Sequence, residues 1–104
     1  VINFRGIKIA PDEIEEAASD YPGIQDCACI PKKDKVSGEV PILVVDADEE
    51  TFDHKAMMQY LRRRVDPDKM PQKIVICHQI PRSYNGKLQR KKLASELLEG
   101  DKVI

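Results

Sequence analysis

The sequence contains no tryptophan, and only 5% of its residues are aromatic. Proteins that stack on bases or sugars, or that cage quaternary ammonium groups, depend on aromatic rings, so these functions have few candidate residues here. There is also no run of about 18 apolar residues, which excludes a membrane span. The first residues lack a charged segment followed by an apolar one, so no signal peptide is expected. We therefore expect a cytoplasmic protein.

Cysteine is scarce as well. Cys27, Cys29 and Cys77 are three in number, which cannot form a complete set of disulfides, and no CxxC pair is present to bind zinc. The first two have the spacing of one strand face and the third lies in an apolar run, which predicts reduced core thiols. His54 and His78 have no partner at ligand spacing, so we expect surface histidines and no metal site.

The length of 104 residues is enough for one domain with one core, but not for a domain that encloses several large substrates. A composition of 41% hydrophobic and 34% charged residues is typical of a globular domain. The net charge of -1 hides an uneven distribution. Residues 46–53 are rich in acids, whereas residues 82–92 are rich in bases and contain no acid.

The order of elements predicted from the sequence is hairpin, helix, hairpin, helix, strand, helix. Residues 1–9 indicate a short hairpin around Arg5 and Gly6, and Pro11 followed by acids begins a helix that ends near Asp20. The later elements are expected as strands at 24–31 and 40–46, a helix capped by Thr51 and ending near 65, a strand at 73–78 and a helix at 90–98. We expect an α+β domain spanning residues 1–104. It would be a two-layer sandwich of a small, mostly antiparallel three-stranded sheet with helices on one side, plus an N-terminal β-hairpin.

The most specific segment is PRSYNGKLQR at residues 81–90. Asn85 and Gly86 predict a tight turn, which would present Lys87 at a loop tip where its ammonium can meet phosphate or carboxylate oxygens. A P-loop is excluded, because the motif requires glycine at 81 and serine or threonine at 88. A nucleic-acid patch is disfavoured because the domain is not basic overall. On spacing alone, a solvated turn before a basic helix face stays open as the alternative.

Four motifs in order carry a family resemblance. Residues 5–15, RGIKIAPDEIE, match the pattern RGxxIxPxEIE, and residues 21–28, YPGIQDCA, match hPxVxDAAV. Residues 37–39, SGE, match a GE turn, and residues 81–93, PRSYNGKLQRKKL, match PxTxNGKxxRxxL. These are motifs of the adenylate-forming ligases, which include acyl-CoA synthetases, peptide-synthetase adenylation domains and luciferases. Because the four motifs together cover most of the chain, the sequence resembles that family strongly.

The resemblance implies the C-terminal lid domain of a larger AMP-forming ligase, most like an acyl-CoA synthetase. In that family an N-terminal domain binds ATP and a carboxylic acid, and the lid closes over it in two orientations. The first orientation serves formation of the acyl-adenylate, and the second serves transfer of the acyl group to a thiol, commonly that of CoA. ATP and CoA are the implied co-substrates, with Mg²⁺ in the full-length enzyme, and the N-terminal domain is the implied partner.

The resemblance also implies roles for individual residues. Lys87 matches the adenylation lysine, and Gly6 matches the glycine of the thiol-transfer loop, where a side chain would obstruct the pantetheine passage. Arg5 and Lys8 flank that glycine and are implied to meet CoA or nucleotide phosphates, with simple solvation as the alternative. Arg90 matches a basic position of the closing motif, which favours a structural or docking role over phosphate contact, and Arg82 is a candidate of the same kind.

Other parts of the family pattern are not in this chain. The hinge residue would lie upstream of Val1, and the ATP-binding motifs would lie in the N-terminal domain, so the isolated domain is expected to be inactive. Pro11 favours a CoA ligase for a fatty or aromatic acid. The alternatives are a peptide-synthetase-type domain that charges a carrier protein, which residues 85–87 fit equally well, and a stand-alone, non-catalytic interaction module of the same fold.

Overall fold

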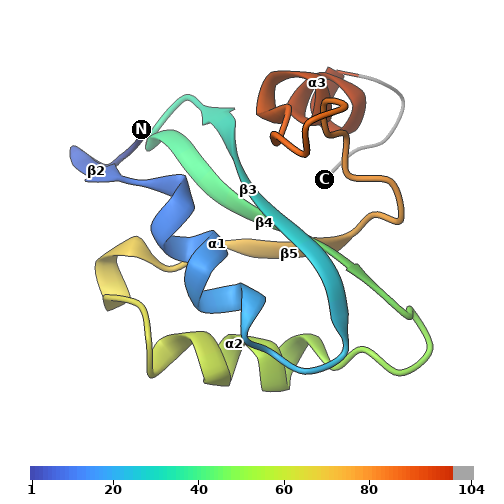
Figure 1. Cartoon of the computed structure of the whole chain (residues 1–104). Coiled ribbons are helices and arrows are strands. Elements are labelled where there is room, and N and C mark those ends of the chain that lie inside the picture. Colours follow the sequence, from blue (N-terminus) through green and yellow to red (C-terminus); the bar gives the residue numbers. More distant parts are fainter. Residues whose placement is uncertain (100–104) are drawn as a thin grey trace.

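The computed structural model describes residues 1–99 and is organised around one antiparallel pair of strands, β3 (Ile24–Asp34) and β4 (Gly38–Ala47) (Figure 1). β5 (Lys73–Ile76) pairs in parallel with β4. The hairpin formed by β1 (Ile2–Phe4) and β2 (Ile7–Ile9) joins the same sheet, because Phe4 lies opposite Gly38 at the start of β4. The predicted hairpin and three-stranded sheet are therefore a single sheet of five strands.

Three α-helices accompany the sheet in the described residues: α1 (Pro11–Ser19), α2 (His54–Arg62) and α3 (Arg90–Ala94). Two further helical segments are η1 (Pro67–Lys69) and the π-helical turn η2 (Ser95–Glu99), which continues α3. α1 begins at Pro11, as predicted, because a proline at the first helical position loses no helical hydrogen bond. α2 begins later than expected. Asp53, and not Thr51, caps it by accepting the Ala56 N–H at 3.0 Å.

Both faces of the β3–β4 pair are buried, which changes the expected layering. Successive side chains of a strand point to opposite faces. Strand residues on one face pack with α1 and α2, and that cluster includes Cys27, Cys29, Leu43, Val45, Ile14, Ala18, Met57 and Leu61. Strand residues on the other face pack with α3 and η2, and that cluster consists of Ala28, Ile30, Ile42, Val44, Leu93 and Leu97. The α+β class is confirmed, whereas the expectation that all helices lie on one side was wrong (Figure 1).

The physical reason lies in the composition of the central strands. Strands that are buried on both faces are near-continuously apolar, whereas strands with one wet face alternate. Residues 27–30 and 41–45 are continuous apolar runs, and every one of them is buried. A second helical layer is therefore needed to keep water from the second face.

Two of the three cysteines, Cys27 and Cys29, are core residues, as predicted. Cys27 and Cys29 are buried, and Cys77 is half-buried against the α3 side of the sheet. Burial raises the pKa of the Cys27 thiol to about 11 and that of the Cys29 thiol to about 12, with the Glu15 carboxylate adding to both shifts. Neither residue supplies a thiolate at neutral pH, so neither is suited to nucleophilic chemistry. Among residues 1–99, no helix is long and apolar enough to cross a membrane.

The α3 layer can be tested by shortening its central apolar side chain. Leu93 is fully buried, so Leu93→Ala should lower the free energy of unfolding by about 2–5 kcal/mol, because it removes apolar contacts and leaves a cavity. Urea denaturation of the 104-residue chain measures this. Lys92→Ala, at an exposed neighbouring position, is the control and should change stability by about 0.5 kcal/mol or less. Equal effects of the two substitutions would contradict the two-sided core.

Candidate active-site loops

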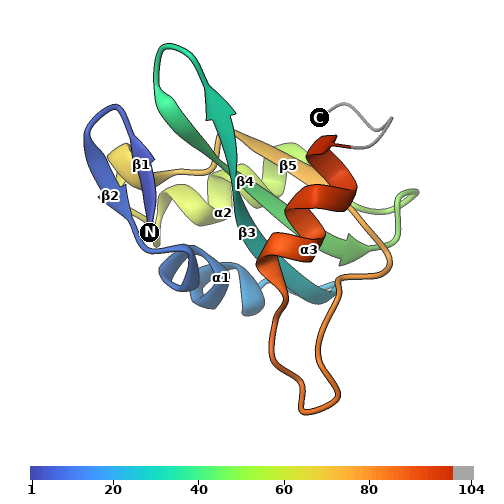
Figure 2. The same ribbon diagram turned by 90° about the horizontal axis from the view of Figure 1, so that it is seen from above.

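Lys87 lies on a tight hairpin in the segment between β5 and α3. The Gly86 N–H donates to the Ser83 carbonyl at 2.8 Å, and the Ser83 N–H donates to the Lys87 carbonyl at 2.8 Å. Arg82 and Leu88 form an isolated antiparallel bridge below the turn. Gly86 has a φ of 86°, which a residue with a side chain rarely adopts. The predicted turn is therefore confirmed, and Lys87 is exposed. Figure 2 shows the hairpin as the orange segment that precedes α3.

Arg82 connects this hairpin to the sheet. Its Nε donates to Oδ2 of Asp26 on β3 at 2.9 Å, and its Nη2 donates to Oδ1 of the same carboxylate at 2.6 Å. Its Nη1 donates to the carbonyl of Gly86 at 2.9 Å. One guanidinium therefore links β3 to the residue that immediately precedes Lys87. The hydrogen bonds from Arg82 lower the pKa of the Asp26 carboxyl below its usual value.

A second arginine–carboxylate pair anchors the far end of the same segment. Arg90, the first residue of α3, donates from Nε and Nη2 to the two carboxylate oxygens of Glu15 on α1. Glu15 Oε2 also accepts the backbone N–H of Cys29 on β3 at 2.8 Å. The Glu15 side chain is only 15% exposed. Arg90 therefore faces the body of the domain, where it joins the last helix to the first helix and to the sheet.

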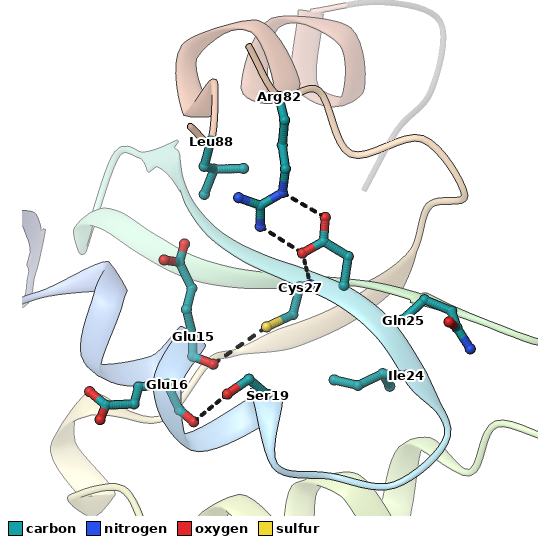
Figure 3. A pocket seen from close by; sticks show the side chains of 9 residues that line it. Glu15, Glu16, Ser19, Ile24, Gln25, Cys27, Arg82 and Leu88 are labelled. Carbon is teal, nitrogen blue, oxygen red and sulfur yellow. Dashed lines mark hydrogen bonds and ion pairs between the residues drawn. The ribbon is translucent and has the colours of Figure 1, made fainter. Parts of the chain in front are cut away.

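Asp26, Arg82 and Glu15 from these two pairs line a hollow between α1, β3 and the closing segment (Figure 3). Leu88 and Cys27 also line it and contribute apolar surface. The Cys27 thiol donates to the main-chain carbonyl of Glu15 at 3.4 Å, so its hydrogen already has an acceptor within the protein. Sequence reasoning did not find Glu15 or Asp26 as part of this site. Both acids stand inside the two N-terminal motifs, but only the fold shows which base each one meets.

The turn between β1 and β2 carries the second predicted loop. Arg5 and Gly6 have φ values of 51° and 81°, the left-handed conformation that a two-residue hairpin of type I′ requires. Both residues are exposed, and a Cβ added to Gly6 would meet no atom within 4 Å. Lys8 is exposed on β2, and the Arg5 guanidinium lies 4.9 Å from the centre of the Phe4 ring. Within this domain, the space at Gly6 is therefore open.

The SGE motif at residues 37–39 holds this turn in place. The Arg5 N–H donates to the Ser37 carbonyl at 2.8 Å, and the Asn3 N–H donates to Oε1 of Glu39 at 2.9 Å. A Cβ on Gly38 would lie 3.0 Å from the Asn3 carbonyl oxygen, so the two hairpins pack too closely for a side chain there. The motif is thus a structural support for the Arg5–Gly6 turn.

The two loops do not form one site within the domain. Figure 2 shows the β1–β2 turn and the hairpin before α3 at different ends of the molecule. Within residues 1–99, no three histidine, cysteine, aspartate or glutamate side chains gather as a metal site would require. His78 is exposed beside Asp46, at 3.3 Å, and Glu49, at 3.5 Å, which agrees with the prediction of a surface histidine. The domain therefore presents two separate loops, each held by its own contacts.

Comparison with known proteins identifies the family. The family model named AMP-binding enzyme C-terminal domain matches residues 13–87. The chain belongs to this family. 4-Coumarate–CoA ligase 2 of Oryza sativa subsp. japonica is 34% identical over 98 residues, which make up 93% of this chain and 17% of that enzyme. The chain therefore spans less than a fifth of the length of the curated relatives it matches.

Solved structures give the same result for the fold. A fatty acyl CoA synthetase of Mycobacterium tuberculosis aligns with a TM-score of 0.85 and 28% identity, covering 90% of this chain and 19% of that one. The o-succinylbenzoate CoA synthetase of Bacillus subtilis, in complex with the acyl-adenylate intermediate OSB-AMP, aligns with a TM-score of 0.81 and 25% identity. That alignment covers 88% of this chain and 19% of the synthetase. The motif resemblance is therefore confirmed, and this chain is a C-terminal domain of the AMP-binding CoA ligases.

The Asp26–Arg82 pair predicts a specific dependence of stability on pH. The folded-state pKa of Asp26 is below its ordinary value of 3.8, so the stabilisation is complete above the unfolded-state pKa and is lost as the pH falls through the folded-state value. Chemical denaturation across pH should show wild type more stable than Asp26→Asn at about pH 6, with the difference shrinking below about pH 4. Asp20→Asn, at a 67% exposed carboxylate paired with Arg64, is the control and should show a smaller difference. A difference for Asp26→Asn that grows on acidification would contradict the ion pair.

Proposed function

We propose that this domain is the lid of an ATP-dependent, AMP-forming carboxylic acid–CoA ligase and that Lys87 is its adenylation lysine. The observation that carries the proposal is the exposed position of Lys87 on its hairpin. The residue before it, Gly86, is hydrogen-bonded to Arg82, which in turn binds β3. A lysine in that position can enter the active site of another domain, because its long stem extends the ammonium away from the tip. Membership of the AMP-binding C-terminal family supports this assignment.

In the first half-reaction, a carboxylate oxygen of the acid attacks the α-phosphorus of ATP, and pyrophosphate leaves. Negative charge is present on both reactants, and it shifts during the attack onto the oxygens around the phosphorus. The Lys87 ammonium would bridge the acid and the nucleotide, so that it orients the nucleophile and stabilises this charge. The Mg²⁺ expected with ATP has no fitting cluster of carboxylates among residues 1–99 and would be held by the N-terminal domain.

In the second half-reaction, the thiol sulfur of CoA attacks the acyl carbon, the thiol proton is lost and AMP leaves. The Arg5–Gly6 turn would line the path of the thiol after the lid has rotated. The open space around Gly6 supports this role, since an absent side chain leaves room for a narrow pantetheine arm. Arg5 and Lys8 are exposed on either side and would meet phosphate groups of CoA. Arg90 would have a structural role and not contact phosphate, because its guanidinium is paired with Glu15.

Two loops at different ends of one domain suit an enzyme that uses its lid twice. A rotation of the lid would exchange the Lys87 hairpin for the Arg5–Gly6 turn at a fixed active site. The acid-binding pocket and the ATP site belong to the N-terminal domain, so the isolated 104-residue chain would be inactive.

The names of the relatives favour CoA as the acceptor. The rice relative is named for 4-coumarate and the mycobacterial structure for fatty acyl groups, so we propose a fatty or aromatic acid as substrate. A lid that charges a carrier protein is the second candidate, favoured by the Asn85–Gly86–Lys87 turn. A cytoplasmic location is part of the proposal and is supported by three free cysteines, which suit a reducing compartment.

Lys87→Ala in the ligase that carries this domain tests the proposal. We expect acid-dependent pyrophosphate exchange to fall by about 100-fold or more, because the positive charge between acid and nucleotide is lost. Thioester formation from preformed acyl-adenylate should stay within about twofold of wild type, since Lys87 acts only in the first half-reaction. Lys91→Ala, an exposed lysine of the same basic stretch, is the matched control. Equal loss of both half-reactions, or exchange activity in the isolated chain, would refute the proposal.

A substitution in the other loop gives the reciprocal test. Gly6→Leu should slow transfer to CoA and spare pyrophosphate exchange, because its side chain would obstruct the thiol path. Gly23→Leu is the control for backbone strain, since Gly23 also has a positive φ and open space around it but lies between α1 and β3. If both substitutions slowed transfer equally, strain alone would explain the effect of Gly6→Leu.

A further inference from the structure

We propose that Arg82 and Asp26 form a positioning pair, which holds the Lys87 hairpin at the place and angle that adenylation requires. This inference rests on the proposed role of Lys87 and adds to it two residues that act through the backbone of the hairpin. The acid lies in the second motif of the chain and the base in the last. They are 56 positions apart in sequence and meet only in the folded domain.

The hairpin tip has little support of its own. Ser83 is half-buried, whereas Tyr84, Asn85, Gly86 and Lys87 are all exposed. In the described part of the chain, the hydrogen bonds shown for residues 83–87 run to one another or to Arg82. The side chain of Arg82 is therefore the polar link that connects the tip to the sheet.

The guanidinium geometry suits this task. Nε and Nη2 form a two-point contact with the Asp26 carboxylate, which fixes the plane of the group. Nη1, in the same rigid plane, then reaches the Gly86 carbonyl at 2.9 Å. Gly86 and Lys87 share a peptide unit, so the direction of that carbonyl determines the direction in which the Lys87 backbone leaves the turn. A lysine at position 82 has only a point-like ammonium and cannot make these three contacts in one plane.

Asp26 is itself held in place. Its Oδ1 also accepts the backbone N–H of Cys27 at 2.9 Å, and β3 is the strand that pairs with β4 over its whole length. The chain of contacts therefore runs from the most extensively paired strand, through Asp26 and Arg82, to the residue before Lys87. The Arg82 and Asp26 side chains are 37% and 28% exposed, so water screens the pair in part and its loss should disturb the hairpin more than the fold.

The test compares Arg82→Gln, Asp26→Asn and the double variant in the ligase that carries the domain. Each single variant should lower kcat for adenylation by about 10- to 100-fold, because a displacement of about 1 Å at a reacting group has effects of this size. The KM for acid and for ATP should change much less, and thioester formation from preformed acyl-adenylate should stay within about twofold. The double variant should be no worse than the worse single variant, since both remove the same contact. Arg82→Lys should not restore the rate.

Arg64→Gln is the matched control. Arg64 also pairs with an aspartate, Asp20, at 3.1 Å, but that pair joins the residue after α1 to the segment after α2 and makes no contact with the hairpin. It should leave both half-reactions unchanged. A second readout uses the 104-residue chain: the backbone ¹⁵N order parameters of Gly86 and Lys87 should fall in Arg82→Gln and not in Arg64→Gln. A merely structural role for Arg82 would instead slow both half-reactions together.

The outcomes separate this inference from the proposed function. If Lys87→Ala abolishes adenylation while Arg82→Gln and Asp26→Asn leave it intact, the positioning pair is refuted and the function of Lys87 stands. If Lys87→Ala has no effect on adenylation, the proposed function itself is refuted, whatever the Arg82 variants do. Unchanged order parameters at residues 86 and 87 in Arg82→Gln would also overturn the inference, because the hairpin would then be held without the pair.

Discussion

The fold of the domain depends on the burial of both faces of the β3–β4 pair. Because residues 27–30 and 41–45 are apolar without interruption, each face needs a helical layer, and α1 with α2 can cover only one of them. The chain must therefore pass from the edge of the sheet at β5 to the opposite face, where α3 packs. The segment that carries Lys87 is the connection that makes this passage (Figure 2), so its location follows from the need to bury the second face.

A long connection of this kind needs anchors, and two arginine–carboxylate pairs provide them. Arg82 meets Asp26 where the hairpin begins, and Arg90 meets Glu15 where α3 begins. Partly exposed pairs of this kind add modestly to stability, but two-point contacts define direction well. Their main effect is to fix how Lys87 is presented. At the other end of the domain, backbone hydrogen bonds and the close approach at Gly38 do the same for the Arg5–Gly6 turn.

Local signals in the sequence predicted much of this structure. Pro11 and the acids after it marked α1, the Arg5–Gly6 pair marked the first hairpin, and Asn85–Gly86 marked the turn before Lys87. These predictions succeeded because proline, glycine and capping residues act through the backbone of their own neighbours. The layering was predicted wrongly, because the apolar stripe of α3 shows that it packs on something but not on which face. The cap at Thr51 was wrong because Asp53 competed for the same helix end.

By itself, the sequence determined the class of the domain, the family to which it belongs and the residue at the tip of the closing hairpin. Each of these follows from patterns within short stretches of the sequence, because a motif or a turn does not depend on a residue far away in the chain. Only the tertiary structure decided that α3 covers the second face of the sheet and that Asp26 meets Arg82 and Glu15 meets Arg90. It also decided that the Lys87 hairpin and the Arg5–Gly6 turn lie at different ends of the domain. The reason is physical: ion pairs between residues 56 and 75 positions apart form only when burial of the core has brought their strands and helices together.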